Sequence, residues 1–287
     1  MTRWHRCVYI GIWLGLFLLM VSSGWGYEEE AVSEGGTIGG RVTLKGSPPP
    51  ARIYHLIFSP NITFCGKISD GNGNRLLREF RVSVDGGFQD VVVAVVGVPK
   101  GKPFDYTPEL TIEHCRIGPF VTPIRNGHRI SLINKDPIAH DVQAYTLKDN
   151  YTFAMFNKPL APETIAARQV DLRAGHAFFR TQCGVHDYMQ SWGMAVGNPY
   201  FAVTGPDGRF TIADLPPGEY DVVAWHPHMR VRTRRVRVEP NGAADLSFEF
   251  DAAEAKIAVH DLQTSYRLQT ALVPAKMVRP DVELQQE

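Results

Sequence analysis

The chain has 287 residues, and its 30 lysines and arginines balance its 30 aspartates and glutamates, so the formal net charge at pH 7 is zero. A balanced charge creates no net field that would favour binding to nucleic acid or to an anionic membrane. No glycine-rich phosphate loop, serine-nucleophile motif or paired-carboxylate motif stands out, so nothing in the sequence favours a hydrolase.

The start of the chain has the pattern of an export signal. An apolar run from Cys7 to Val21 follows two arginines, and small residues come after it at Gly24 and Gly26. The run is shorter than the roughly 20 residues that a membrane-spanning helix needs. We therefore predict a signal peptide over residues 1–26, and a periplasmic or secreted mature protein. The alternative is an uncleaved membrane anchor.

Short apolar or alternating runs fill the chain between Gly36 and Phe250, and Gly, Pro, Asn and Asp separate them. This pattern is typical of an all-β sandwich or barrel. The segment 90–96 is nearly all apolar and β-branched, so we expect it in the core. The predicted strands are 37–44, 80–84, 90–96, 111–112, 129–134, 141–145, 177–182, 193–196, 201–204, 209–212, 220–225 and 231–238.

A metal-binding pattern accompanies the middle strands. Cys183, His186 and Met189 follow one predicted strand with two residues between each pair, and His140 directly precedes another. A Cys-x-x-His-x-x-Met run can fold as a tight loop with all three side chains on one metal. One thiolate, two imidazoles and one thioether are the ligand set of a mononuclear blue copper centre. We predict that these four residues bind one copper ion, with zinc as the competing metal.

The run from Cys183 to Met189 resembles the ligand loop of the cupredoxins, and its spacing is that of the amicyanin type. The segment Leu132-Ile133-Asn134-Lys135-Asp136 is similar to the strand and turn that deliver the first histidine in that family. The resemblance covers residues 80–198 and implies a Greek-key β-sandwich. It also implies that His186 reaches the surface through an apolar patch, where it is the exit for an electron.

The sequence departs from the cupredoxin pattern directly after the first histidine. Many cupredoxins have Asn there, with a side chain that can bond across to the cysteine loop, whereas this chain has Asp141. A carboxylate puts extra negative charge near the sulfur. The departure bears on the reduction potential and the spectroscopic class of the site more than on copper binding.

Three cysteines remain after signal removal, namely Cys65, Cys115 and Cys183. In an oxidising compartment two of the three are expected to pair. A disulfide between Cys65 and Cys115 would leave Cys183 as the free thiolate that copper requires, although the sequence alone leaves the pairing open.

A second histidine pattern, His226-Pro227-His228, raises the question of another copper ion, as in multicopper oxidases and copper nitrite reductases. No cysteine adjoins it. We interpret it as a turn with exposed imidazoles, so redox catalysis at a second centre is disfavoured and we predict that the protein is not an enzyme.

A different pattern begins near Asn198-Pro199. Tight turns at Asp207-Gly208 and Pro216-Pro217-Gly218 separate short alternating strands. Residues 199–250 resemble the carboxypeptidase regulatory-like, or transthyretin-like, β-sandwich module, and the resemblance implies a non-catalytic structural or docking domain.

The module is short for a sandwich of about seven strands. We predict a tandem arrangement, with a cupredoxin-like copper domain over 27–198, the module over 199–250 and a tail over 251–287. In the alternative, strand 36–46 completes the C-terminal module and the copper domain is inserted between them.

These features predict an all-β, exported type 1 copper protein that carries single electrons between periplasmic redox partners. Such partners would be a c-type cytochrome or a periplasmic dehydrogenase, and we expect no nucleic acid and no stable membrane insertion after signal cleavage. The alternatives are a copper-binding or delivery protein, and a structural sandwich with a vestigial metal site.

Overall fold

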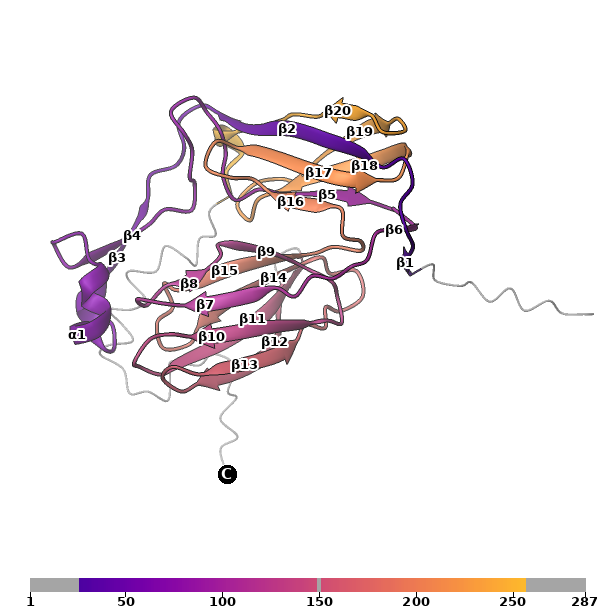
Figure 1. The fold of residues 1–287 in the computed structure, drawn as a ribbon. Helices are drawn as coiled ribbons and strands as arrows, with labels where there is room; N and C mark the ends of the chain where they lie inside the picture. The colour runs from indigo at the N-terminus through magenta and orange to yellow at the C-terminus, as the bar shows by residue number, and fades with distance from the viewer. Residues whose placement is uncertain (1–25, 149–150, 257–287) are drawn as a thin grey trace, which may run out of the picture.

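The computed structural model describes residues 26–148 and 151–256. The predicted signal peptide and most of the predicted tail lie outside these residues. Two β-sandwiches, stacked on each other, make up nearly all of the fold (Figure 1), which confirms the all-β class. In the described part of the chain, no helix is long and apolar enough to cross a membrane.

The first sandwich, which we call the ligand sandwich, consists of two sheets. One sheet has the order β13 (Ile165–Gln169), β10 (Arg129–Asn134), β7 (Glu109–Ile112) and β8 (Ile117–Gly118). The other has the order β12 (Tyr151–Leu160), β11 (His140–Lys148), β14 (Phe178–Cys183), β15 (Gln190–Ala195) and β9 (Val121–Ile124). Alternate residues of β10, β11 and β14 are buried, and they form one core between the sheets.

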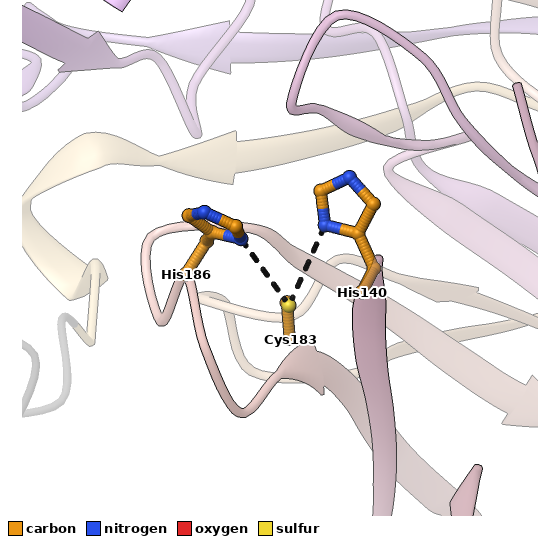
Figure 2. A group of neighbouring side chains, drawn as sticks. All are labelled: His140, Cys183 and His186. Atoms are coloured by element: carbon orange, nitrogen blue, oxygen red, sulfur yellow. Dashed lines mark hydrogen bonds between the residues drawn. The ribbon is translucent and has the colours of Figure 1, made fainter. Parts of the chain in front are cut away.

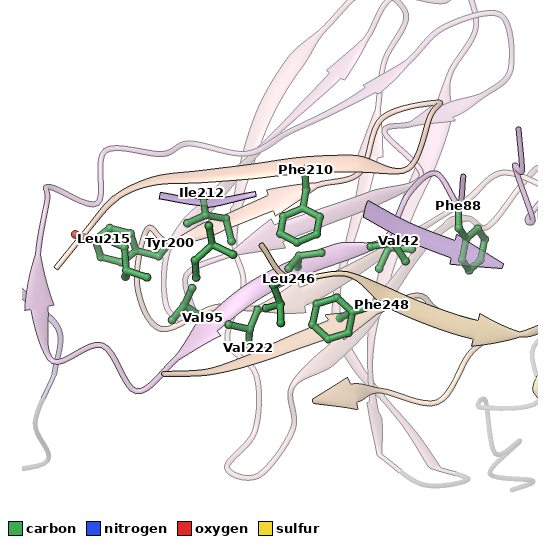
Figure 3. Packing of buried hydrophobic residues seen from close by; sticks show 14 of the residues in the cluster. Val42, Phe88, Val95, Tyr200, Phe210, Ile212, Leu215, Val222, Leu246 and Phe248 are labelled. Atoms are coloured by element: carbon green, nitrogen blue, oxygen red, sulfur yellow. The ribbon is translucent and has the colours of Figure 1, made fainter. Parts of the chain in front are cut away.

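The second sandwich combines strands from both ends of the chain. One sheet has the order β16 (Phe201–Val203), β5 (Val92–Val96), β18 (Gly218–Trp225) and β19 (Arg232–Val238). The other has the order β17 (Arg209–Leu215), β2 (Gly36–Lys45) and β20 (Ala243–Asp245), and β21 (Phe248–Asp251) also pairs with β2. Strand β2, from the N-terminal part of the chain, therefore lies beside the C-terminal strands β17 and β21, and the side chains of these strands fill one core (Figure 3).

Strand β5 is buried on both faces, and this explains its continuous run of apolar residues. Val93 and Val95 point into the core of the second sandwich. Val92 and Ala94 pack with Trp192 and other residues of the ligand sandwich in a separate cluster. The two sandwiches thus share an apolar interface.

The remaining elements are short. Strands β1 (Glu28–Glu29) and β6 (Lys100–Gly101) form a parallel pair, and the 3-10 helix η3 (Ala252–Glu254) follows β21. Strands β3 (Arg52–His55) and β4 (Asn74–Leu77) form a hairpin that encloses the 3-10 helix η1 (Leu56–Phe58), the helix α1 (Ile62–Cys65) and the 3-10 helix η2 (Gly66–Ile68). We call residues 52–77 the cap.

The strand predicted over 80–84 is wrong. Val82 makes only an isolated bridge with Phe88, because the chain turns back at once: the Ser83 amide donates to the Gly87 carbonyl and the Gly86 amide to the Ser83 carbonyl. The sequence analysis also missed the cap hairpin and strands β9, β12, β13, β20 and β21.

Candidate metal centre

Strand pairing brings two of the predicted ligands to the same end of one sheet. Strands β11 and β14 are antiparallel, and Val142 lies opposite Cys183. Directly opposite residues share a face, and so do residues two apart on one strand. His140 and Cys183 therefore both point into the core of the ligand sandwich, as the alternating burial of the two strands requires.

The loop between β14 and β15 returns His186 to the same place. The Gly184 amide donates to the Asp141 carbonyl over 2.7 Å, which ties the start of the loop to β11. The Met189 amide donates to the His186 carbonyl over 2.9 Å, and the Cys183 amide donates to the Met189 carbonyl over 3.1 Å. The loop is therefore a tight turn that closes on the ligand residues.

Both imidazoles direct Nδ1 at the Cys183 sulfur (Figure 2). The Sγ to Nδ1 distance is 3.7 Å for His140 and 3.6 Å for His186. One ligand atom from each of the three residues lies within 4.8 Å of the others, and the exposed fractions are 0% for Cys183, 0% for His186 and 1% for His140.

The distances fit a shared metal ion. With metal to sulfur and metal to nitrogen bonds of about 2.3 and 2.0 Å, an angle of roughly 110–120° at the ion separates the two donors by roughly 3.5–3.8 Å. The donor set of one soft sulfur and two imidazoles suits copper, and zinc accepts the same ligands.

The fourth predicted ligand, Met189, is bound into the same loop through its backbone. Its side chain is buried and belongs to the same core cluster as Cys183. The role of its sulfur as an axial ligand stays a prediction.

The electrostatics of the site favour neutral ligands before a metal binds. Burial raises the pKa of the Cys183 thiol, and the Asp141 charge adds to this, while backbone hydrogen bonds from the loop oppose it. Burial and the neighbouring His140 lower the pKa of His186 to about 4. Burial also lowers the pKa of His140, although Asp136 opposes the shift. The histidines are therefore unprotonated at neutral pH, and a metal cation would displace the thiol proton.

Asp136 positions His140 from behind. The Nε2 hydrogen of His140 is directed at Oδ2 of Asp136 over 2.9 Å, and the backbone amides of His114 and Cys115 donate to the same carboxylate over 2.5 and 2.8 Å. With Nε2 occupied as a donor, the Nδ1 lone pair faces the sulfur. The sequence analysis named Asp136 only as part of the strand and turn before His140 and did not predict that it bonds to this histidine. Its position four residues before the histidine was the available signal.

Cys65 and Cys115 form a disulfide, and Cys183 is the free cysteine of the described residues, which is the pairing that a copper site at Cys183 requires. Cys115 also lies near Asp136 and His140 in a second group of ligand-type residues. Its sulfur is committed to the disulfide, so this second group offers no thiolate.

The expectation that His186 reaches the surface is wrong, because the cap covers it. Nε2 of His186 donates to the Pro60 carbonyl over 3.2 Å and lies 3.6 Å from the Cys65 sulfur. The disulfide fastens the cap to the turn that contains Cys115. The imidazole edge is therefore enclosed by a segment that the sequence analysis did not recognise.

The predicted turn at His226–His228 is present, with the Met229 amide donating to the His226 carbonyl over 3.0 Å, but the predicted exposure of its imidazoles is wrong. Their exposed fractions are 0% and 2%. Both rings pack against Phe80 and Phe120, and Nε2 of His226 donates to the Glu79 carbonyl over 3.1 Å. Among the residues that the structure covers, no group of three ligand-type side chains includes either one.

The Asp141 carboxylate is occupied within its own strand. Its Oδ2 accepts from the side-chain amide of Gln143 over 2.8 Å, while its backbone carbonyl holds the loop. A Cβ atom at Gly184 would lie 2.4 Å from Nε2 of Gln143 and 2.5 Å from Oδ2 of Asp141, so a larger residue there would have to displace these two side-chain ends.

A comparison with known families agrees with the resemblance of the C-terminal module. A family model described as the carboxypeptidase regulatory-like domain matches residues 194–251. Solved structures similar to this chain include a purple cupredoxin from Nitrosopumilus maritimus, at 15% identity and a TM-score of 0.26, with 31% of this chain and 98% of that chain covered. No curated protein matches the chain.

Two further solved structures are similar at the same level. Amicyanin from Paracoccus versutus is 15% identical, with 36% of this chain and 96% of that chain covered and a TM-score of 0.26. A copper-containing nitrite reductase from Thermus scotoductus is 14% identical, with 35% of this chain and 25% of that chain covered and the same TM-score of 0.26. The group of His140, Cys183 and His186 fits a copper protein.

Proposed function

We propose that this chain is an exported mononuclear copper protein that carries single electrons between redox partners. The observation that carries the proposal is the buried group in which Nδ1 of His140 and Nδ1 of His186 face the Cys183 sulfur at 3.6–3.7 Å. When bound there, copper supplies a one-electron couple between its cuprous and cupric states.

Rigid ligands support electron transfer, because little rearrangement then accompanies a change of oxidation state. Asp136 holds His140, the Pro60 carbonyl holds His186, and the Cys183 amide donates to the Met189 carbonyl within the loop. Burial of all three side chains keeps water and small substrates from the ligands, which favours passage of an electron over chemistry on a bound molecule.

The cap indicates where the electron would leave. His186 is hydrogen-bonded to Pro60, and Pro60 itself is exposed. Two large apolar side chains flank it in sequence, Ile57 at 71% exposure and Ile62 at 43%. Weak, small encounters are typical of redox partners, and an exposed apolar surface suits them. We infer that a partner such as a c-type cytochrome or a periplasmic dehydrogenase docks on the cap.

Export agrees with the disulfide, because such bonds persist in oxidising compartments. The signal pattern over residues 1–26 supports the same location, in the periplasm or outside the cell.

A visible spectrum of copper-loaded protein tests the metal assignment. Wild type should show intense sulfur-to-copper charge transfer, Cys183→Ser should abolish it, and His128→Gln, at a surface histidine away from the ligand group, should keep it. Unchanged colour in Cys183→Ser would defeat the assignment.

Kinetics then separate electron transfer from copper delivery. Stopped-flow mixing with a reduced c-type cytochrome should give fast reoxidation of the cytochrome by the cupric protein. Ile62→Lys should slow that reaction roughly tenfold, whereas Val203→Lys, at a side chain of similar exposure (38%) on the other sandwich, should not. Slow electron exchange together with ready loss of copper to a chelator would favour delivery instead.

A further inference from the structure

A cleft of about 800 Å³ lies beside the ligand loop and plays no part in the proposed electron transfer. Its walls come from the end of the cap, from the turn and strand around Cys115, and from the start of β15. The volume lies in the range of sites that hold small organic molecules, roughly 300–1,000 Å³.

The cleft carries an excess of positive charge. Five arginines line it, against the acidic residues Asp70, Glu79 and Glu113; the arginines are Arg52, Arg75, Arg78, Arg81 and Arg116. Each acidic residue is already engaged: Glu79 pairs with Arg52, Glu113 with Lys135, and Asp70 accepts from amides of its own loop.

Three of the five arginines therefore remain uncompensated. Arg81 pairs with Asp90 outside the cleft. Within residues 26–148 and 151–256, Arg75, Arg78 and Arg116 have no carboxylate within ion-pair distance. Arg78 and Arg116 are exposed, whereas Arg75 is half-buried, so a bound anion would relieve mainly the cost of burying Arg75 without a counterion.

Arg75 shows the strain most clearly. Its Nε atom is buried and has no hydrogen-bond partner among the described residues. Burial lowers the pKa of Arg75, and the positive charge of Arg116, which lines the same cleft, lowers it further. An unsatisfied buried donor costs about 1–3 kcal/mol. A guanidinium group matches the planar fork of a carboxylate or the oxygens of a phosphate.

Part of the wall is apolar. Ile117, Phe120 and Trp192 line the cleft together with Leu77. An inorganic ion would leave these apolar side chains exposed to water, whereas the apolar part of an organic anion would cover them.

We propose that this cleft binds a small organic anion, with its acidic group between Arg75 and Arg116 and its apolar body against Phe120 and Trp192. The site adjoins the proposed copper site, because Tyr188 and the predicted axial ligand Met189 also line it, but it does not include His140, Cys183 or His186.

Calorimetric titration of the metal-free protein at low ionic strength tests the proposal. The probes are phthalate, inorganic phosphate and the uncharged phthalamide. Phthalate should bind saturably and more tightly than phosphate, and phthalamide should not bind. Because the titration needs no copper, it fails or succeeds independently of the spectrum that tests the metal site.

Charge-removing variants localise the binding. Arg75→Gln and Arg116→Gln should each weaken phthalate binding at least tenfold, whereas Arg230→Gln, an exposed arginine outside the cleft, should bind as wild type does. The cleft variants should unfold at the same or a higher temperature than wild type without anion, because each removes repulsion. Absence of saturable binding, binding of phthalamide, or equal weakening by Arg230→Gln would overturn the proposal.

Discussion

Asp136→Asn is the sharpest test of how the fold prepares its metal ligands. The carboxylate is buried and accepts three hydrogen bonds, from Nε2 of His140 at 2.9 Å and from the amides of His114 and Cys115 at 2.5 and 2.8 Å. An amide has one accepting oxygen in place of two and carries no charge, so at least one donor loses its partner. At about 1–3 kcal/mol for each buried unsatisfied donor, we expect a loss of about 2–4 kcal/mol in the free energy of unfolding.

Metal binding should weaken separately from stability. Without its acceptor, His140 no longer has a fixed tautomer, and loss of such an outer partner typically costs 10–100-fold in metal affinity. Urea unfolding of the metal-free protein measures the first effect, and competition with a chelator for copper measures the second. Asp105→Asn, at an exposed position, is the control. If Asp136→Asn and Asp105→Asn bind copper equally well, Asp136 does not position His140.

Three other perturbations address the cap, the histidines and the loop. Replacing both Cys65 and Cys115 with Ala removes a cross-link between residues 50 apart, so loop entropy predicts a loss of about 4 kcal/mol in the free energy of unfolding. Urea unfolding measures this loss under conditions that keep the wild-type disulfide oxidised. Amide hydrogen exchange at the residues around Pro60 should also become faster. Because the pKa of His186 falls to about 4 on folding, the unfolded chain takes up a proton at a higher pH than the folded chain does. The free energy of unfolding of the metal-free protein should therefore fall by up to about 3 kcal/mol as pH drops from 6.5 to 4. A pH-independent stability across that window would contradict the burial of this imidazole. Gly184→Ala should cost only about 1 kcal/mol, because the new Cβ displaces the side-chain ends of Gln143 and Asp141 and disturbs the hydrogen bond between them. Thermal unfolding with and without copper measures this cost and any effect on copper binding.

The ligand group was predictable because it depends on local spacing and on strand periodicity. Cys183 and His186 share one loop, and His140 needs only an antiparallel neighbour in the right register to join them. Most strands were predictable for the same reason, since alternation along β10, β11 and β14 reflects one buried face. Counting cysteines predicted that two of the three would pair, whereas the structure was needed to identify the pair as Cys65 and Cys115.

What escaped prediction depends on contacts between distant segments. β9 contains Pro123, which reads as a strand breaker, yet β9 is at the edge of its sheet, where proline is tolerated. β12 is also an edge strand, and its Lys158-Pro159 step resembles a turn. The covering of His186 and the burial of His226 both arise from packing by segments far away in sequence, which no local pattern records.

The cap hairpin escaped for a related reason. Its helix α1 has only four residues, too few to establish a helical period, and β3 and β4 are half-exposed. Contacts with distant segments hold it over the metal centre: the disulfide, the bond from His186 to the Pro60 carbonyl, and the contacts of Tyr54 with Asp187 and Tyr188 in the ligand loop.

The ligand loop connects the two proposed sites, and electrostatics predict the direction in which anion binding shifts the reduction potential of the copper. Met189 belongs to the loop of the copper ligands and also lines the basic cleft. A negative charge bound there stabilises the cupric state more than the cuprous state, because the cupric ion carries one more positive charge. An anion should therefore lower the reduction potential, and by linkage the cupric protein should bind phthalate more tightly than the cuprous protein by the same free energy. Equal affinities in the two oxidation states would mean that the sites share a loop but not an electrostatic field.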